Sequence, residues 1–159
     1  MAASASSVLV IHGPNLNLLG QREPGIYGRQ TLADLDASLV ALGERLGLAV
    51  RCQQANGEGE IIDLLHEAGR DCIGVVINPG GYTHTSVAIA DALRAIGIPA
   101  IEVHLSNLYA REGFRHESRT ATACRGVIMG LGPDSYLLAL RHLVAFSSDS
   151  ARAATMEPA

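Results

Sequence analysis

The stretch Ile73-Gly74-Val75-Val76-Ile77-Asn78-Pro79-Gly80-Gly81-Tyr82 decides the fold class. Its first five residues are almost entirely apolar, which is typical of a strand buried on both faces of a parallel sheet. The residues that follow predict a tight turn whose backbone amides are open to a ligand. The segment therefore predicts an interior strand that ends at a polar loop.

Apolar strands and amphipathic helices alternate on both sides of this segment. The predicted strands are Val8–Ile11, Leu48–Gln53, Ile73–Ile77, Ala100–Leu105 and Gly126–Met129. The predicted helices start after Thr31, after Gly59, at about Thr85 and at Pro133. This alternation predicts a flavodoxin-like, doubly wound α/β fold with a five-stranded parallel sheet in three α/β/α layers.

The length of 159 residues suits one domain with a sizeable core, and 48% hydrophobic content is typical of a globular chain. We expect a disordered N-terminus over residues 1–7, a single α/β domain over 8–146 and a flexible tail over 147–159. The N-terminus lacks a basic region before an apolar segment, so we expect no secretory signal and a cytoplasmic protein.

The composition argues against several classes of function. A net charge of -4 without a basic stripe predicts no nucleic-acid partner, and no apolar run reaches the ~20 residues of a membrane span. All twelve basic residues are arginine, so no lysine can form a Schiff base or serve a P-loop. The cysteines form no C-x-x-C pair and the histidines lack zinc-site spacing. We therefore expect inert thiols, no metal and no cofactor.

Candidate functional residues gather where strands end. Ligands of doubly wound sheets bind beyond the carboxyl ends of the strands. Asn15 follows the first predicted strand, Asn78 follows the third, and Glu102 and His104 lie in the last residues of the fourth. These polar side chains should therefore share one edge of the sheet.

Glu102 and His104 are two residues apart on a strand, so their side chains share one face. A neighbouring carboxylate favours the charged imidazole and fixes its tautomer, which makes His104 a candidate general acid. A buried structural ion pair explains the same spacing equally well.

The long loop after the first strand carries Arg22 and Tyr27, and ordered loops of this length are often lids or binding loops. Free tyrosine has a pKa of ~10 and is a poor base at neutral pH, but nearby arginines such as Arg22 and Arg111 favour the phenolate. A turn tyrosine that covers the core is the alternative.

A second polar segment contains Arg111, Arg115 and Arg119, which could hold a carboxylate and hydroxyl groups or could form a solvated loop. His84 and Asp91 are seven residues apart near one helix start. They could reach the same cleft, or lie on the surface or at a subunit contact.

Together these motifs resemble the type II 3-dehydroquinate dehydratases over about residues 8–145. The matching segments are His12-Gly13-Pro14-Asn15-Leu16-Asn17-Leu18-Leu19-Gly20, Arg22-Glu23-Pro24, Tyr27-Gly28, Asn78-Pro79-Gly80-Gly81, Glu102-Val103-His104-Leu105-Ser106-Asn107, Arg111-Glu112, Phe114-Arg115 and Gly126-Val127-Ile128. The resemblance implies anti elimination of water from 3-dehydroquinate through an enolate, giving 3-dehydroshikimate, without Schiff base or metal. It also implies a flavodoxin-like fold, trimers assembled into dodecamers, and a role in the shikimate pathway or in quinate breakdown.

The resemblance also implies a role for each matching residue. Tyr27 would be the base, Arg22 and Arg111 would stabilise its phenolate, and Asn15 would stabilise the enolate oxygen through a water. His104, oriented by Glu102, would protonate the leaving hydroxyl. The substrate carboxylate would be held by Asn78, the Gly81 turn and the backbone at Leu105 and Ser106. His84, Asp91 and Arg115 would contact the ring hydroxyls of the substrate or the neighbouring subunit.

Three positions depart from the family pattern, namely Gly57, Gly113 and Ser135. None has a catalytic role, so they bear on affinity or local packing. Two other functions stay open. A flavin or nucleotide binder would need a hydroxyl-rich loop after the first strand, where this chain has Gly-Pro-Asn-Leu-Asn. A non-catalytic binding protein on the same fold would have to retain the catalytic set unused.

Overall fold

The computed structural model describes residues 6–21, 25 and 29–155. Its centre is one parallel five-stranded sheet in the order β2-β1-β3-β4-β5. The strands are β1 (Ser7–His12), β2 (Ala49–Gln54), β3 (Gly74–Asn78), β4 (Ala100–His104) and β5 (Gly126–Met129). This strand order confirms the flavodoxin-like fold class.

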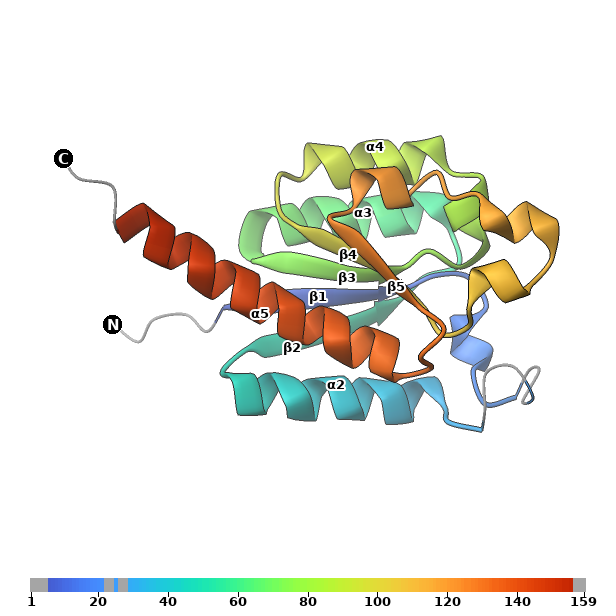
Figure 1. Cartoon of the computed structure of the whole chain (residues 1–159), viewed down its shortest axis with the longest axis horizontal. Coiled ribbons are helices and arrows are strands. Elements are labelled where there is room, and N and C mark those ends of the chain that lie inside the picture. The colour runs from blue at the N-terminus through green and yellow to red at the C-terminus, as the bar shows by residue number, and fades with distance from the viewer. Residues whose placement is uncertain (1–5, 22–24, 26–28, 156–159) are drawn as a thin grey trace.

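Helices cover both faces of the sheet (Figure 1). The helices are α2 (Leu32–Leu46), α3 (Glu58–Asp71), α4 (Val87–Ala95) and α5 (Asp134–Thr155). One core lies between the sheet and α2 and α5, and the other lies between the sheet and α3 and α4. Among the described residues, no helix combines the length and the apolar character needed to cross a membrane.

Helix α2 forms where the sequence predicts it. The Thr31 hydroxyl accepts the backbone N–H of Asp34, and the Asp34 carboxylate accepts that of Thr31, which satisfies two donors at the helix start. Leu35, Leu39 and Leu42 face the core at helical spacing. Gly47 ends the helix with a φ of 72°, a left-handed conformation that suits glycine.

Helices α3, α4 and α5 have boundaries that differ from the sequence predictions, and α3 starts at Glu58, before the predicted position after Gly59. Helix α4 starts at Val87 because the Ser86 hydroxyl caps it, accepting the N–H of Ile89 at 2.9 Å. Helix α5 continues through Thr155, so residues 147–155 of the expected flexible tail are helical. The hydroxyls of Ser148 and Ser150 donate to carbonyls four residues earlier, and alanine favours the helix beyond them.

Gly13 brings the loop after β1 against the turn after β3. Its N–H donates to the carbonyl of Asn78 at 2.8 Å. A Cβ at position 13 would lie 2.6–2.7 Å from backbone atoms of Asn78 and Pro79, which is too close for any side chain. The glycine therefore fixes the distance between two loops that carry candidate site residues.

Candidate active site

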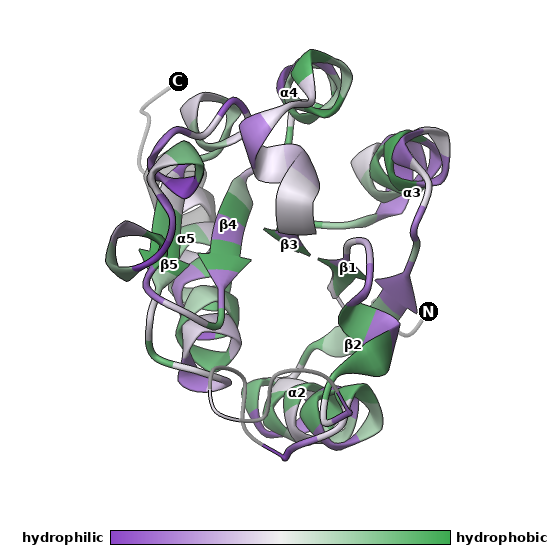
Figure 2. Cartoon of the chain, turned by 90° about the vertical axis from the view of Figure 1, so that its right-hand side faces the viewer, coloured by the Kyte–Doolittle hydropathy of each residue, from purple (hydrophilic) through white to green (hydrophobic). Residues whose placement is uncertain are grey.

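The carboxyl ends of β1, β3 and β4 form one open cavity of about 170 Å³. Figure 2 views the sheet from this end, with the strands running from β5 to β2 across the molecule. Three of the predicted catalytic residues line the cavity, namely Asn15, His104 and Arg111. Six of the predicted substrate-binding residues also line it, namely Asn78, Gly81, His84, Leu105, Ser106 and Arg115.

His104 and Glu102 form a buried pair whose histidine reaches the cavity. Nε2 of His104 lies 2.7 Å from Oε1 of Glu102. The carboxylate can only accept, so Nε2 carries the hydrogen, and Nδ1 is the ring nitrogen left for a ligand. Both side chains are buried, which fits a structural ion pair. The His104 ring also lines the cavity, which a general acid requires.

Hydroxyl groups surround the Glu102 carboxylate. Thr83 donates to Oε1 at 2.5 Å, and Thr120 donates to Oε2 at 2.6 Å. Burial alone would raise the pKa of Glu102, but the hydrogen bonds from His104, Thr120 and Thr83 outweigh it and hold that pKa below its ordinary value. Glu102 is therefore an anion at neutral pH, and it can orient His104 and stabilise its charged form.

We expect the substitution Thr120→Val to lower the free energy of unfolding by about 1.5–3 kcal/mol, because it removes a buried hydrogen bond to a charged group. Urea unfolding at neutral pH measures the loss. The control is Thr122→Val, at an exposed position, which should change the free energy by less than about 0.5 kcal/mol. Equal effects of the two substitutions would contradict the role of Thr120.

The same variant has a defined pH dependence. Since folding lowers the pKa of Glu102 from 4.5, the ionised carboxylate stabilises the fold above that pH. This contribution is lost as the pH falls through the folded-state pKa. The difference in the free energy of unfolding between wild type and Thr120→Val should therefore shrink below about pH 4.5. A difference that stays constant with pH would contradict a role of Thr120 in stabilising the ionised Glu102.

Asn78 is buried and its amide is held by the protein on both sides. Nδ2 donates to the hydroxyl of Tyr136 at 2.9 Å, and Oδ1 accepts the N–H of Gly80 at 3.1 Å. An amide nitrogen carries two hydrogens, so the second is available to a ligand in the cavity. The fixed orientation presents a donor, as the binding of a carboxylate requires.

Two arginines and a histidine, Arg111, Arg115 and His84, also line the cavity. Glu112 lies 2.8 Å from Nε of Arg115 and 3.5 Å from Nε of Arg111, which places both guanidinium groups. Nδ1 of His84 lies 2.7 Å from the carbonyl of Glu117, so this nitrogen donates and Nε2 can accept a hydroxyl. The guanidinium groups can bind a carboxylate and the histidine can accept a hydroxyl, so these residues suit a small acid with several hydroxyl groups.

The model of the family described as "Dehydroquinase class II" matches residues 6–144. The chain belongs to the class II dehydroquinase family. A protein of Rhizobium johnstonii named 3-dehydroquinate dehydratase is 56% identical over 137 residues, which cover 86% of this chain and 94% of that protein. The crystal structure of a type II dehydroquinase from Butyrivibrio crossotus superposes on this fold with a TM-score of 0.86 at 45% sequence identity. The match covers 89% of this chain and 99% of the other.

A more distant structure, a 3-dehydroquinate dehydratase-like protein of Bifidobacterium longum, has a TM-score of 0.68 at 29% identity and covers 90% of this chain and 98% of its own. The fold thus extends to a protein that is described only as similar to the enzyme. Within the dehydroquinase family, the residues in the cavity therefore determine the chemistry more closely than the fold does.

Not every predicted site residue joins the cavity in the single chain. Asp91 lies on the exposed side of α4 and pairs with Arg94 at 3.2 Å, outside the cavity lining. Arg22 and Tyr27 lie outside the described residues. Their roles stay predictions.

Sequence reasoning missed several side chains that support the site. Thr83 and Thr120 hold Glu102, and Tyr136 holds Asn78, across sequence separations of 19, 18 and 58 residues. No local pattern of the dehydroquinase motifs predicts such contacts, since they depend on how the strands and helices pack. Burial raises the pKa of Cys52 and of Cys124 to about 12, which disfavours a free thiolate at these two positions.

Proposed function

We propose that the chain dehydrates 3-dehydroquinate to 3-dehydroshikimate by anti elimination through an enolate. The observation that carries the proposal is the buried pair of His104 and Glu102 opening into a cavity that also holds Asn78 and Arg111. Membership of the class II dehydroquinase family and close relatives named 3-dehydroquinate dehydratase support the same substrate.

The proposed reaction has two chemical steps. Tyr27, as a phenolate stabilised by Arg22 and Arg111, removes the proton next to the ketone, and a water held by Asn15 stabilises the enolate oxygen. His104 then donates its Nδ1 hydrogen to the leaving hydroxyl as the enolate electrons form the carbon–carbon double bond and water departs. Asn78 and the backbone at Leu105 and Ser106 bind the carboxylate throughout. Closure of the long loop after β1, which carries Arg22 and Tyr27, would exclude water from the reaction.

We further propose that the enzyme serves the shikimate pathway, with quinate breakdown as the other setting, and that it works in the cytoplasm. Trimers assembled into dodecamers are the proposed assembly, and His84, Asp91 and Arg115 are the proposed contacts to ring hydroxyls or to a neighbouring subunit. An exposed Asp91 agrees with a role at such an interface. A monomeric mass by light scattering at micromolar concentration would contradict this assembly.

The first experiment is to add 3-dehydroquinate to the purified protein and follow the ultraviolet absorbance of the conjugated enone product. We expect the absorbance to rise, and to rise equally after treatment with a chelator or with borohydride. Loss of activity with borohydride would indicate a Schiff base, and loss with the chelator would indicate a catalytic metal. No rise with folded protein would reject the proposed substrate.

A further inference from the structure

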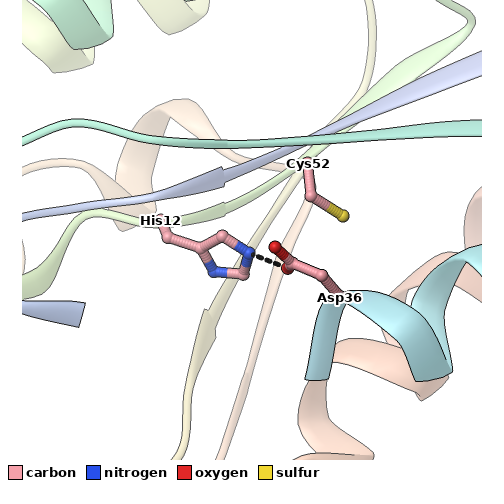
Figure 3. A group of neighbouring side chains, drawn as sticks. All are labelled: His12, Asp36 and Cys52. Carbon is pink, nitrogen blue, oxygen red and sulfur yellow. Dashed lines mark hydrogen bonds and ion pairs between the residues drawn. The ribbon is translucent and has the colours of Figure 1, made fainter. Parts of the chain in front are cut away.

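Three potential metal ligands meet on the sheet face that α2 covers. His12 is the last residue of β1, Cys52 lies in the neighbouring strand β2, and Asp36 lies in the second turn of α2. One nitrogen, one carboxylate oxygen and the sulfur all lie within 4.8 Å of one another. Figure 3 shows the three side chains converging, with the hydrogen bond between His12 and Asp36 drawn.

The register of the sheet explains how residues so far apart in sequence converge. Val10 pairs with Cys52 and His12 pairs with Gln54, so Cys52 and His12 are diagonal neighbours on the same face. Asp36 follows Leu35, whose side chain is buried on the inner side of α2. This cluster lies on the α2 side of the sheet, separate from the pair of His104 and Glu102.

We propose that His12, Asp36 and Cys52 form a binding site for a single Zn²⁺ ion, with water as the fourth ligand. Imidazole, thiolate and carboxylate are the three ligand types that proteins use for zinc. Ligand atoms of a tetrahedral zinc site lie about 3.3–3.7 Å apart, given metal–ligand distances of about 2.0–2.3 Å. The three ligand atoms all lie within 4.8 Å of one another, so changes of up to about 1 Å in their separations reach this geometry.

The charges of the cluster balance those of a divalent ion. Nε2 of His12 lies 2.8 Å from the Asp36 carboxylate, and a neutral imidazole, one carboxylate and one thiolate together carry two negative charges. Binding of Zn²⁺ releases the thiol proton to solvent and leaves a neutral site. A neutral site costs least to bury, and His12 is fully buried.

The ring of His12 is held from its other side by Tyr136. Nδ1 lies 3.3 Å from the Tyr136 hydroxyl, and a partner at this position fixes the orientation of a metal-binding imidazole. Zinc at Nε2 makes Nδ1 the donor, and the Tyr136 hydroxyl hydrogen then loses Nδ1 as its acceptor. This reversal has a cost, so we expect weaker binding than at zinc sites with four protein ligands.

The ion has a route to the site. Asp36 has a side chain that is 32% exposed, while His12 lies behind it at the end of the strand. The carboxylate can therefore capture a hydrated ion before the imidazole and the thiolate replace its water molecules. None of the three residues belongs to the proposed catalytic set, although the Tyr136 hydroxyl lies between His12 and Asn78.

The test is to titrate the chelator-treated full-length protein with Zn²⁺ by calorimetry and with Co²⁺ by absorbance. We expect one Zn²⁺ per chain with a dissociation constant of about 1 µM or tighter, and release of about one proton, measured in buffers of different ionisation enthalpy. Bound Co²⁺ should give a thiolate-to-metal charge-transfer band and the strong visible bands of tetrahedral cobalt.

Three variants make the test specific. Cys52→Ser should abolish the charge-transfer band, and Asp36→Asn should weaken Zn²⁺ binding by at least about tenfold. The matched control is Cys72→Ser, which removes a thiol elsewhere and should retain both the band and the affinity. Saturation only near millimolar Zn²⁺, or an unchanged cobalt spectrum in folded Cys52→Ser, would overturn the proposal.

Discussion

Replacing His104 with alanine should lower kcat by about 10²–10⁴-fold while substrate still binds. His104 contacts the cavity, and its Nε2 is engaged by Glu102 at 2.7 Å. Nδ1 is then the atom that can donate to the leaving hydroxyl. Steady-state kinetics by the ultraviolet assay gives kcat, and calorimetry with the product gives binding.

Loss of His104 also leaves the buried Glu102 carboxylate without its hydrogen-bond donor, which can destabilise the fold. The variant His104→Gln separates the two effects, because its amide can donate to Glu102 but cannot transfer a proton. It should be as slow as His104→Ala and more stable to urea. The control His66→Ala, on an exposed position of α3, should have normal kcat. A normal kcat in folded His104→Gln would exclude His104 as the acid.

The cavity could be predicted from sequence where a residue ends a strand. The rule that ligands bind at the carboxyl ends of parallel strands depends only on strand position, and it brought together Asn15, Asn78 and His104. Asn15 adds a left-handed backbone with a φ of 69°, which turns the chain just after β1. Such a conformation is accessible to asparagine but cannot be deduced from one asparagine in a sequence.

The supporting contacts could not be predicted, because they depend on packing distances. The spacing of Glu102 and His104 fits a structural pair and a catalytic pair alike, and only burial together with contact to the cavity distinguishes them. The hydroxyls of Thr83 and Thr120 join His104 in lowering the pKa of Glu102, yet both lie on other segments.

The sequence-based expectation of no metal is limited in the same way, because it cannot take packing into account. It depends on the spacing of histidines and cysteines within short motifs, whereas His12, Asp36 and Cys52 come from three separate elements. Strand register and helix packing bring them together, and neither is visible in local spacing. A site of this kind can be found only after the fold is known.

Replacing Tyr27 with phenylalanine should also lower kcat by about 10²–10⁴-fold, because the variant lacks the phenolate that removes the proton. The described flanks of this loop lie beside the cavity. Leu19 lines the cavity, and a Cβ on Gly20 would lie 3.0 Å from the carbonyl of Arg29, so the two ends of the loop meet beside the site. The control Tyr109→Phe, at an exposed position outside the cavity lining, should have normal kcat.

Proton exchange distinguishes the two catalytic variants. If Tyr27 forms the enolate before His104 acts, substrate incubated in D₂O with His104→Gln should exchange the proton next to the ketone without losing water. Substrate incubated with Tyr27→Phe should neither exchange nor react, since the enolate cannot form. Exchange with Tyr27→Phe at the wild-type rate would assign the base to another residue. Absence of exchange with His104→Gln, despite bound substrate, would instead mean that proton removal and loss of the hydroxyl occur in one step.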